Sequence, residues 1–228
     1  MFNMILWIAS YPKSGNTYLR SFLASYYFSK KGKFDFNLLM NIPQFPSIRF
    51  SKKDFLSFND AANNWIPNQK YFFNKKKLFF LKTHNSLNKF NNFEFTTDNE
   101  TLGGIYIIRD PRNIITSIKN HYRLDENNTI KWMTDKNNYI YDVERVKEVG
   151  YGDFQFISSW EVNYKSWQTQ NKIPIKLIKY EDLSNKTYSI FLEIIEFIYK
   201  ITNSSAQVNK RRLKNALNST TFEKLQER

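Results

Sequence analysis

The segment from Tyr11 to Thr17 combines residue types that bind phosphate groups. After a Tyr-Pro pair it contains Lys13, Ser14, Gly15, Asn16 and Thr17. The glycine lets the backbone approach an anion closely, the polar side chains offer hydrogen-bond donors, and the lysine adds a mobile positive charge. An ordinary helix cap needs only a Ser or an Asn, so the combination favours anion binding over simple capping.

Lys82-Thr83-His84 is a second segment that could do chemistry. An imidazole has a reference pKa of about 6.5, which makes His84 a candidate general base near neutral pH. The alternative is a histidine that is hydrogen-bonded for structural reasons at the end of a strand. His121 is the only other histidine and a weaker candidate, for which a structural or acceptor-pocket role is favoured.

The third candidate set begins with Arg109-Asp110-Pro111 and includes Ser117, eight residues beyond Arg109. An arginine fork and a serine hydroxyl can converge on one phosphate group. A surface arginine beside Asp110 and a solvent-facing serine would give the same sequence. These residues alone therefore do not decide between a phosphate site and an ordinary surface.

The apolar pattern indicates which elements position these side chains. Continuous apolar runs, typical of parallel strands buried on both faces, occupy residues 4–9, 78–81 and 105–108, and Ile175-Lys176-Leu177-Ile178 after Pro174 predicts a fourth strand. Apolar residues at helical spacing occupy residues 19–27, 114–118, 154–167, 185–200 and 206–217. The alternation predicts an α/β fold with a P-loop-type parallel sheet flanked by helices on both faces. In such sheets ligands bind at the carboxyl ends of the strands, where the polar segments lie.

Two segments are less regular. Residues 34–76 are interrupted by Pro43, Pro46 and Pro67, and we expect helical stretches only near residues 51–62. Residues 124–152 are polar, and we expect an irregular loop or lid there.

Composition excludes several classes of site. The chain has 228 residues, of which 41% are hydrophobic, so residues 1–228 suit one domain with a large core. The absence of cysteine excludes disulfides, thiolate metal sites and cysteine nucleophiles, and two histidines make a multi-histidine metal site improbable. We expect no metal, no transmembrane segment and no signal peptide, hence a cytoplasmic protein.

The formal net charge of +13 leaves two interpretations open. A basic surface attracts nucleotides, nucleic acid, anionic lipid or acidic sugars. Lysines scattered on a solvated surface, in a chain rich in lysine throughout, need no ligand.

Tyr-Pro-Lys-Ser-Gly-Asn-Thr-Tyr resembles the 5′-phosphosulfate loop of sulfotransferases that use 3′-phosphoadenosine 5′-phosphosulfate (PAPS), usually written Y-P-K-S-G-T-T-W. Asn16 replaces the first threonine of that motif. Tyr18 replaces the tryptophan, which in the family stacks on adenine. Lys82-Thr83-His84 is similar to the family's K-T-H motif, in which the histidine is the general base and the lysine helps to hold the sulfuryl group.

The resemblance implies roles for further residues. Arg109 and Ser117 match the family's ligands of the 3′-phosphate. Tyr180, in Lys179-Tyr180-Glu181-Asp182-Leu183, resembles a family residue that contacts the nucleotide base. A tyrosine that only packs on the core at a strand end is almost as good an explanation of this segment. The implied reaction uses PAPS and leaves adenosine 3′,5′-bisphosphate (PAP), without a metal. Lys13 would stabilise the leaving phosphate and the transferring group, with Lys82 assisting.

The acceptor implied by the resemblance is a hydroxyl or amine on a small molecule, carbohydrate or lipid, not a specific nucleic acid. The chain departs from the family at its end. Many members continue with an Arg-Lys-Gly segment that closes over the 3′-phosphate, whereas this sequence stops at Phe222–Arg228, about where that segment would begin. The family's dimer motif is not visible there either.

Two other functions stay open at this stage. The first is a non-catalytic or degenerate nucleotide- or polyanion-binding protein, which the charge and the short end would suit. The second is a P-loop nucleotide kinase. A Walker A loop needs two glycines with a lysine after the second, whereas Lys13 precedes the only glycine of its loop.

Overall fold

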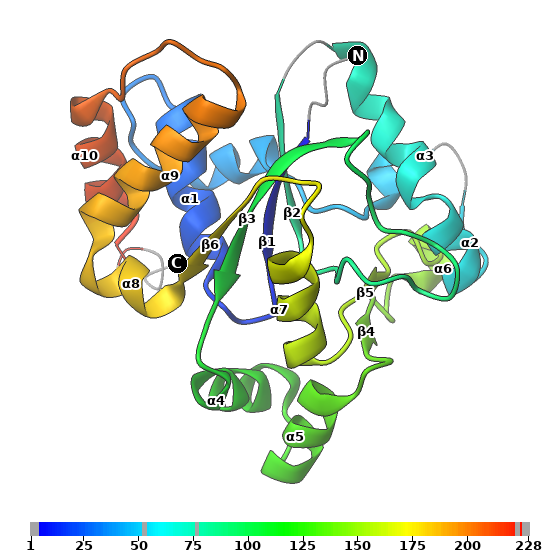
Figure 1. The fold of residues 1–228 in the computed structure, drawn as a ribbon. Helices are drawn as coiled ribbons and strands as arrows, with labels where there is room; N and C mark the ends of the chain where they lie inside the picture. The colour runs from blue at the N-terminus through cyan, green and yellow to red at the C-terminus, as the bar shows by residue number, and fades with distance from the viewer. Residues whose placement is uncertain (1–4, 52–53, 76–77, 222–223, 225–228) are drawn as a thin grey trace.

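The computed structural model describes residues 5–51, 54–75, 78–221 and 224. Its centre is a four-stranded parallel sheet in the order β2-β1-β3-β6 (Figure 1). The strands are β1 (Ile5–Ser10), β2 (Phe79–Thr83), β3 (Thr101–Ile108) and β6 (Ile175–Lys179). Ala9 pairs with Thr83, Ser10 with Ile107 and Ile108 with Lys179, so all four strands end at one edge of the sheet.

Strand β1 occupies the position in the sheet where a ligand crevice is expected. Every residue of β1 is buried, because it has a strand on each side and helices over both faces. The chain leaves β1 toward β2 on one side and then returns to β3 on the other. In open parallel sheets such a reversal of direction opens a crevice at the carboxyl ends of the strands.

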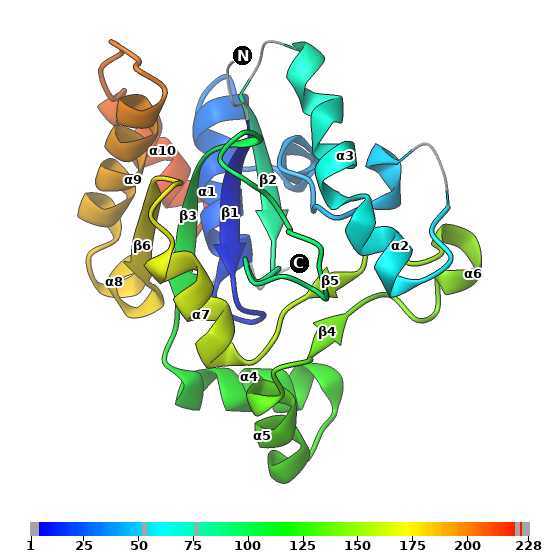
Figure 2. The same ribbon diagram turned by 45° about the vertical axis from the view of Figure 1, so that its right-hand side comes forward.

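Helices cover the two faces of the sheet (Figures 1 and 2). One face packs on α1 (Asn16–Phe28), α9 (Thr187–Ile201) and α10 (Lys210–Ser219), with Leu6 and Ile8 in that core. The other face buries Trp7 beneath α2 (Phe58–Asn63), α3 (Trp65–Gln69) and α7 (Trp160–Thr169). The alternation of Leu6, Trp7 and Ile8 between two cores follows from the period of two in a strand.

A third layer lies beyond the carboxyl edge of the strands. Figure 1 shows α4 (Pro111–Tyr122) and α5 (Glu126–Thr134) below the strand ends, where a small core gathers Tyr11, Ile114, Ile118, Met133 and Ile157. The remaining elements are α6 (Val146–Val149), α8 (Tyr180–Asn185), the short strands β4 (Tyr139–Ile140) and β5 (Gln155–Phe156), and 3₁₀ turns at Phe36–Asn41, Ile48–Phe50 and Lys70–Lys75.

The structure confirms the α/β class and the four strands predicted from apolar runs, with residue 4 of the first run outside the described residues. β3 begins earlier than predicted, at Thr101. Within the expected helical stretch 51–62, residues 52–53 are not described, and α2 begins only at Phe58. The helix expected from residue 206 begins at Lys210.

Two predictions were wrong. Residues 154–167 do not form one helix: residues 155–156 pair as β5, and Ser159 caps a helix that begins at Trp160. Residues 124–152 are not an irregular loop, because they contain α5, β4 and α6. The apolar side chains of β5 and of α7 together have the spacing of one helix, although the chain changes from strand to helix between them.

Helix α7 holds the segment that follows β2. Trp167, fully buried, donates from Nε1 to the Asn85 carbonyl at 2.9 Å, and Asn163 donates from Nδ2 to the His84 carbonyl at 2.9 Å. The Asn163 side chain is fixed in turn by the Tyr106 hydroxyl, which donates to Oδ1 at 2.7 Å. These bonds hold His84 and Asn85 against helix α7.

Replacing Trp167 with Phe should lower the free energy of unfolding by about 1–3 kcal/mol, because the buried Asn85 carbonyl loses its partner. Urea unfolding at neutral pH measures the change. The matched control is Trp160→Phe, a partly exposed tryptophan on the same helix that donates to no atom in the described part of the chain, and its effect should be smaller. Equal effects would show that the Trp167 bond does not stabilise this packing.

Candidate functional site

The polar segments predicted from the sequence meet at one sheet edge. The loop of residues 11–15 follows β1, His84 follows β2, Arg109 follows β3 and Tyr180 follows β6. Because the four strands are parallel and in register, these residues lie at neighbouring strand ends.

The loop after β1 is shaped to present N–H groups. Lys13 has φ 66° and Gly15 has φ 91°, and α1 begins at the next residue. Within the described residues, the N–H groups of Gly15, Asn16 and Thr17 donate to no protein atom. The Ser14 hydroxyl is also buried without a partner. Free donors at the positive end of a helix suit the binding of an anion.

Tyr180 packs directly on Gly15. A Cβ added to Gly15 would lie 2.4 Å from Cδ2 of the Tyr180 ring, so no other residue fits without moving the tyrosine. The positive φ independently favours glycine at this position. The sequence indicated a glycine for close approach to a phosphate; the structure adds close approach to an aromatic ring.

Arg109 joins the loop to Tyr180. Its Nη1 donates to the Lys13 carbonyl at 2.9 Å, and its guanidinium carbon lies 4.4 Å from the centre of the Tyr180 ring. The Nε of Arg109 is buried without a hydrogen-bond partner. No carboxylate pairs with Arg109 in the part of the chain that the structure describes, so its charge is available to an anion.

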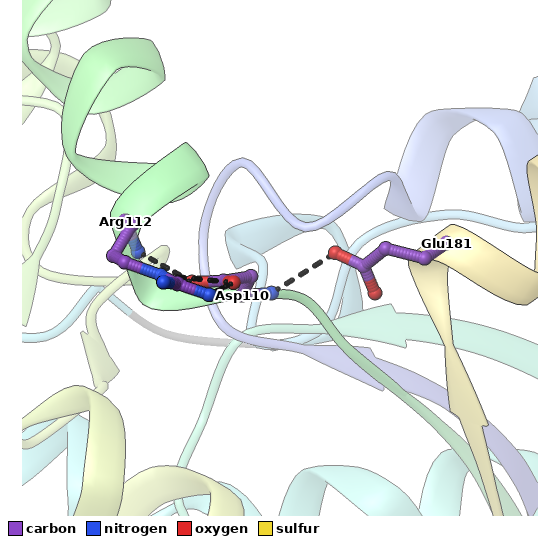
Figure 3. Close-up of polar contacts among 3 residues, drawn as sticks. All are labelled: Asp110, Arg112 and Glu181. Carbon is purple, nitrogen blue, oxygen red and sulfur yellow. Dashed lines mark hydrogen bonds and ion pairs between the residues drawn. The ribbon is translucent and has the colours of Figure 1, made fainter.

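Unlike Arg109, the neighbouring Arg112 is paired with a carboxylate, as Figure 3 shows. It forms an ion pair with Asp110, whose Oδ1 accepts from the Arg112 Nε at 3.0 Å, and this pairing lowers the pKa of Asp110 to about 2. Asp110 also caps α4 by accepting from the Arg112 N–H, while its own N–H donates to Glu181 at 3.2 Å. Pairing thus occupies Arg112 and leaves Arg109 free.

Asn16 does not match its predicted role as a side-chain donor to a ligand. Its side chain is buried, and Nδ2 donates to the Ile8 carbonyl at 3.1 Å and to the Ser10 hydroxyl at 3.2 Å. Both amide hydrogens are therefore used inside the protein. Only the backbone N–H of Asn16 remains for an anion, and the side chain instead ties β1 to the start of α1.

His84 is held by its backbone and by one ring nitrogen. Nδ1 lies 2.7 Å from the Ser10 carbonyl, an acceptor, so Nδ1 carries the proton and donates while Nε2 keeps a free lone pair. The His84 N–H donates to the Gln155 side chain at 2.8 Å. Burial, and then the charge of Lys82, hold the pKa of His84 well below its usual value, so the ring is neutral at neutral pH.

Lys82 lies two residues before His84, and no carboxylate of the described residues pairs with its side chain. Its ammonium donates to the Gln44 side chain at 2.6 Å. Burial and the charge of Arg20 lower the pKa of Lys82 to about 7. Arg20, on α1, donates to the Ile42 carbonyl at 2.7 Å, and burial lowers its own pKa to about 10.

Tyr18 and Tyr180 line a pocket of about 800 Å³ together with Thr187, Tyr188 and Lys214. The pocket adjoins the loop after β1, because Tyr180 also covers Gly15. Its three tyrosines offer surfaces on which a planar ring could stack.

Three further predicted residues lie on nearby helices. Thr17 is exposed on the first turn of α1, and Ser117 is half-buried on α4. No described contact joins either side chain to Arg109, so their roles stay predictions. His121 is exposed near the end of α4, and burial together with the charge of Lys13 lowers its pKa.

Sequence reasoning missed the residues that orient the site. Ser10, Gln44, Gln155 and Asn163 each bond to His84 or Lys82, yet none belongs to a recognisable motif. In the described residues no group of three His, Asp or Glu side chains is arranged to hold a metal. No described helix is both long and apolar enough to cross a bilayer.

Residues 5–228 match the sequence model of a protein family described as "Sulfotransferase domain". No curated protein matches the sequence. The fold is similar to mouse sulfotransferase SULT7A1 complexed with PAP, at 16% identity and a TM-score of 0.57, over 100% of this chain and 67% of that one. It is also similar to retinol dehydratase in complex with androsterone and PAP, at 14% identity and a TM-score of 0.59. That match covers 98% of this chain and 66% of the other. At such identities the likeness shows the fold, and the chain spans about two thirds of these proteins.

Lys82→Met should raise the free energy of unfolding near pH 7 by about 1–2 kcal/mol, and the gain should shrink to nothing as the pH rises past about 10. The sign follows from the lowered pKa. Between about pH 7 and the ordinary pKa of 10.5 the unfolded chain binds a proton that the folded chain has released, so stability of the parent rises with pH in this window.

Urea unfolding at a series of pH values measures the effect of Lys82→Met. Lys147→Met, on the exposed surface of α6, is the matched control and should change stability little at any pH. A variant that loses stability equally across the window would show that contacts of the ammonium outweigh the cost of burying it.

Proposed function

This chain belongs to the sulfotransferase domain family, and from that premise we propose that it moves the sulfuryl group from PAPS to a hydroxyl or amine of an acceptor. One observation carries the proposal. A loop with free N–H groups, an arginine with no carboxylate partner and a neutral histidine with a free Nε2 lie at neighbouring strand ends.

The residues fit a nucleotide with phosphates at both the 5′ and 3′ positions. The free N–H groups and the buried Ser14 hydroxyl suit the 5′-phosphosulfate. Arg109, with an unpartnered Nε and the predicted help of Ser117, suits the 3′-phosphate. The pocket beside Tyr18 and Tyr180 suits the adenine ring. PAP in both similar structures supports this assignment.

The chain's own residues would carry the reaction in one concerted transfer. PAPS supplies the sulfuryl group. His84 Nε2 takes the proton of the acceptor hydroxyl while the acceptor oxygen forms a bond to sulfur, and the bond between sulfur and the 5′-phosphate oxygen breaks. Lys13 and the loop N–H groups balance the charge that develops on the leaving oxygen, and Lys82 contributes to the same positive field.

The charge of the donor also bears on the strength of the base. The lowered pKa of His84 arises partly from the charge of Lys82, which lies two residues earlier in the chain. An anionic phosphosulfate beside Lys82 and Lys13 offsets that charge and so raises the pKa of His84 toward its ordinary range. His84 would thus become a stronger base only when the donor is bound.

The acceptor is proposed only by class, as a small molecule, carbohydrate or lipid. The similar retinol dehydratase was crystallised with androsterone. In this chain the acceptor would approach His84 from the segment around Gln44, which bonds to Lys82. The single domain over residues 1–228 and the cytoplasmic location stay predictions. The segment Phe222–Arg228, where the sequence departs from the family pattern, lies almost entirely outside the described residues.

Calorimetric titration with PAP tests the cofactor assignment, with ATP–Mg²⁺ as the control nucleotide. PAP should bind and ATP–Mg²⁺ should bind far more weakly. Arg109→Ala should weaken PAP binding by about 10- to 100-fold, the cost of one charge-assisted phosphate contact, and should change AMP binding much less because AMP lacks the 3′-phosphate. Equal losses for PAP and AMP would show that Arg109 does not bind the 3′-phosphate.

His84→Ala should lower the rate of sulfuryl transfer by about 10²- to 10⁴-fold, the usual contribution of a general base, while PAP affinity changes by less than about threefold. PAP release in the presence of an acceptor that the parent protein turns over measures the rate. His121→Ala, the other histidine variant, should keep most of the activity. Normal turnover by His84→Ala would contradict the assignment of the base.

A further inference from the structure

A second basic pocket lies away from the proposed transfer site. It has a volume of about 610 Å³ and is lined by Lys30, Lys31, Lys33, Arg211, Arg212 and Asn215. The three lysines follow the end of α1, and the arginines open α10. Helix α1 starts at the transfer-site edge and has 13 residues, so the pocket is about 20 Å away, toward the opposite edge of the sheet.

The described part of the chain does not balance the charges of this pocket with ion pairs. Among the described residues, none of the five cations forms an ion pair, although other lysines and arginines of the chain do. Like charges gathered in one concave surface repel one another and attract an anion. A general excess of lysine accounts poorly for this cluster, because two of its members are adjacent arginines.

The first turn of α10 has charges that are unfavourable at the start of a helix. Its first residues are Lys210, Arg211 and Arg212, and its first turn contains no acidic residue. Positive side chains at this end oppose the helix dipole, which favours anions there. A bound anion would reverse this unfavourable arrangement by contacting both the cations and the helix end.

The pocket is held in shape by bonds between its two walls. Asn215 donates from Nδ2 to the Lys31 carbonyl at 2.8 Å, and Arg212 donates from Nη2 to the Ser29 carbonyl. Gly32 has φ 74°, and a Cβ there would lie 2.7 Å from the Arg212 carbonyl oxygen. The Nε of Arg212 is nevertheless buried without a partner, so one guanidinium donor of a fixed side chain is left unused.

From these observations we infer that this pocket is a second anion site, which binds a soluble compound carrying two or more phosphate or sulfate groups. Five cations exceed the charge of one phosphate group, so a ligand with several such groups is needed to balance them. A mixture of guanidinium, ammonium and amide donors suits the tetrahedral oxyanions of both esters. The concave shape favours a discrete compound over a flat membrane surface.

The test uses inorganic tripolyphosphate and sucrose octasulfate as separate probes, titrated calorimetrically at about 150 mM NaCl to screen weak surface attraction. The variant is the double charge reversal Lys31→Glu/Arg211→Glu, at two exposed side chains with no described contact. The control is Lys147→Glu/Lys172→Glu, which changes the net charge by the same amount at exposed positions elsewhere.

Tripolyphosphate, sucrose octasulfate or both should bind the parent protein. In the pocket variant, the affinity of the second site for the probe that binds should fall by at least about tenfold. The control variant should lose less than about threefold. The probe that binds more tightly identifies the ester. Equal losses in the two variants would overturn the proposal, as would binding to vesicles with about 20% phosphatidylserine when neither probe binds.

The second anion site is independent of the proposed sulfuryl transfer. The same variants distinguish a failure of one proposal from a failure of the other. Lys31→Glu/Arg211→Glu should leave the PAP contact of Arg109 intact, so that adding Arg109→Ala still weakens PAP binding as it does in the parent. A protein that binds tripolyphosphate at the second pocket but shows no effect of Arg109→Ala would retain this inference and lose the nucleotide assignment.

Discussion

The contact of the Arg109 guanidinium with the Lys13 carbonyl and the Tyr180 ring is the constraint on which the site depends. It ties the loop after β1 to the ends of β3 and β6, and it is possible only because Gly15 has no Cβ to strike the tyrosine. A backbone carbonyl and an aromatic face hold the arginine in place without neutralising it. The arginine is therefore positioned while its charge stays available.

The same absence of neutralisation extends through the proposed transfer site. Lys82 bonds to an uncharged amide, and Arg20 bonds to backbone carbonyls. Burying unpaired charges is unfavourable, and the lowered pKa values of Lys82 and His84 are its direct expression. In the sulfotransferase domain family to which the chain belongs, an anionic donor is the natural counterpart of such a field.

Much of this arrangement could be predicted from the sequence, because the apolar strands and the motifs at their ends are local features. The run before Ser10, the glycine loop and Lys82-Thr83-His84 each sit where the alternation of strands and helices placed them. The inward turn of Asn16 could not be predicted, since Asn is equally suited to bind a ligand or a carbonyl. Nor could the bonds of Gln155 and Asn163, which join residues more than seventy positions apart in the chain.

The partly buried Lys82 has a consequence for how the protein exchanges protons with solvent. A group with a pKa of about 7 is only half protonated in the empty protein near neutrality. An anion that settles beside it favours the charged form, so part of each binding event is the uptake of a proton. If the donor binds beside Lys82 as proposed, its binding would be coupled to acidity: alkaline conditions would weaken it before any change in the fold, and the apparent binding enthalpy would include the ionisation of the buffer.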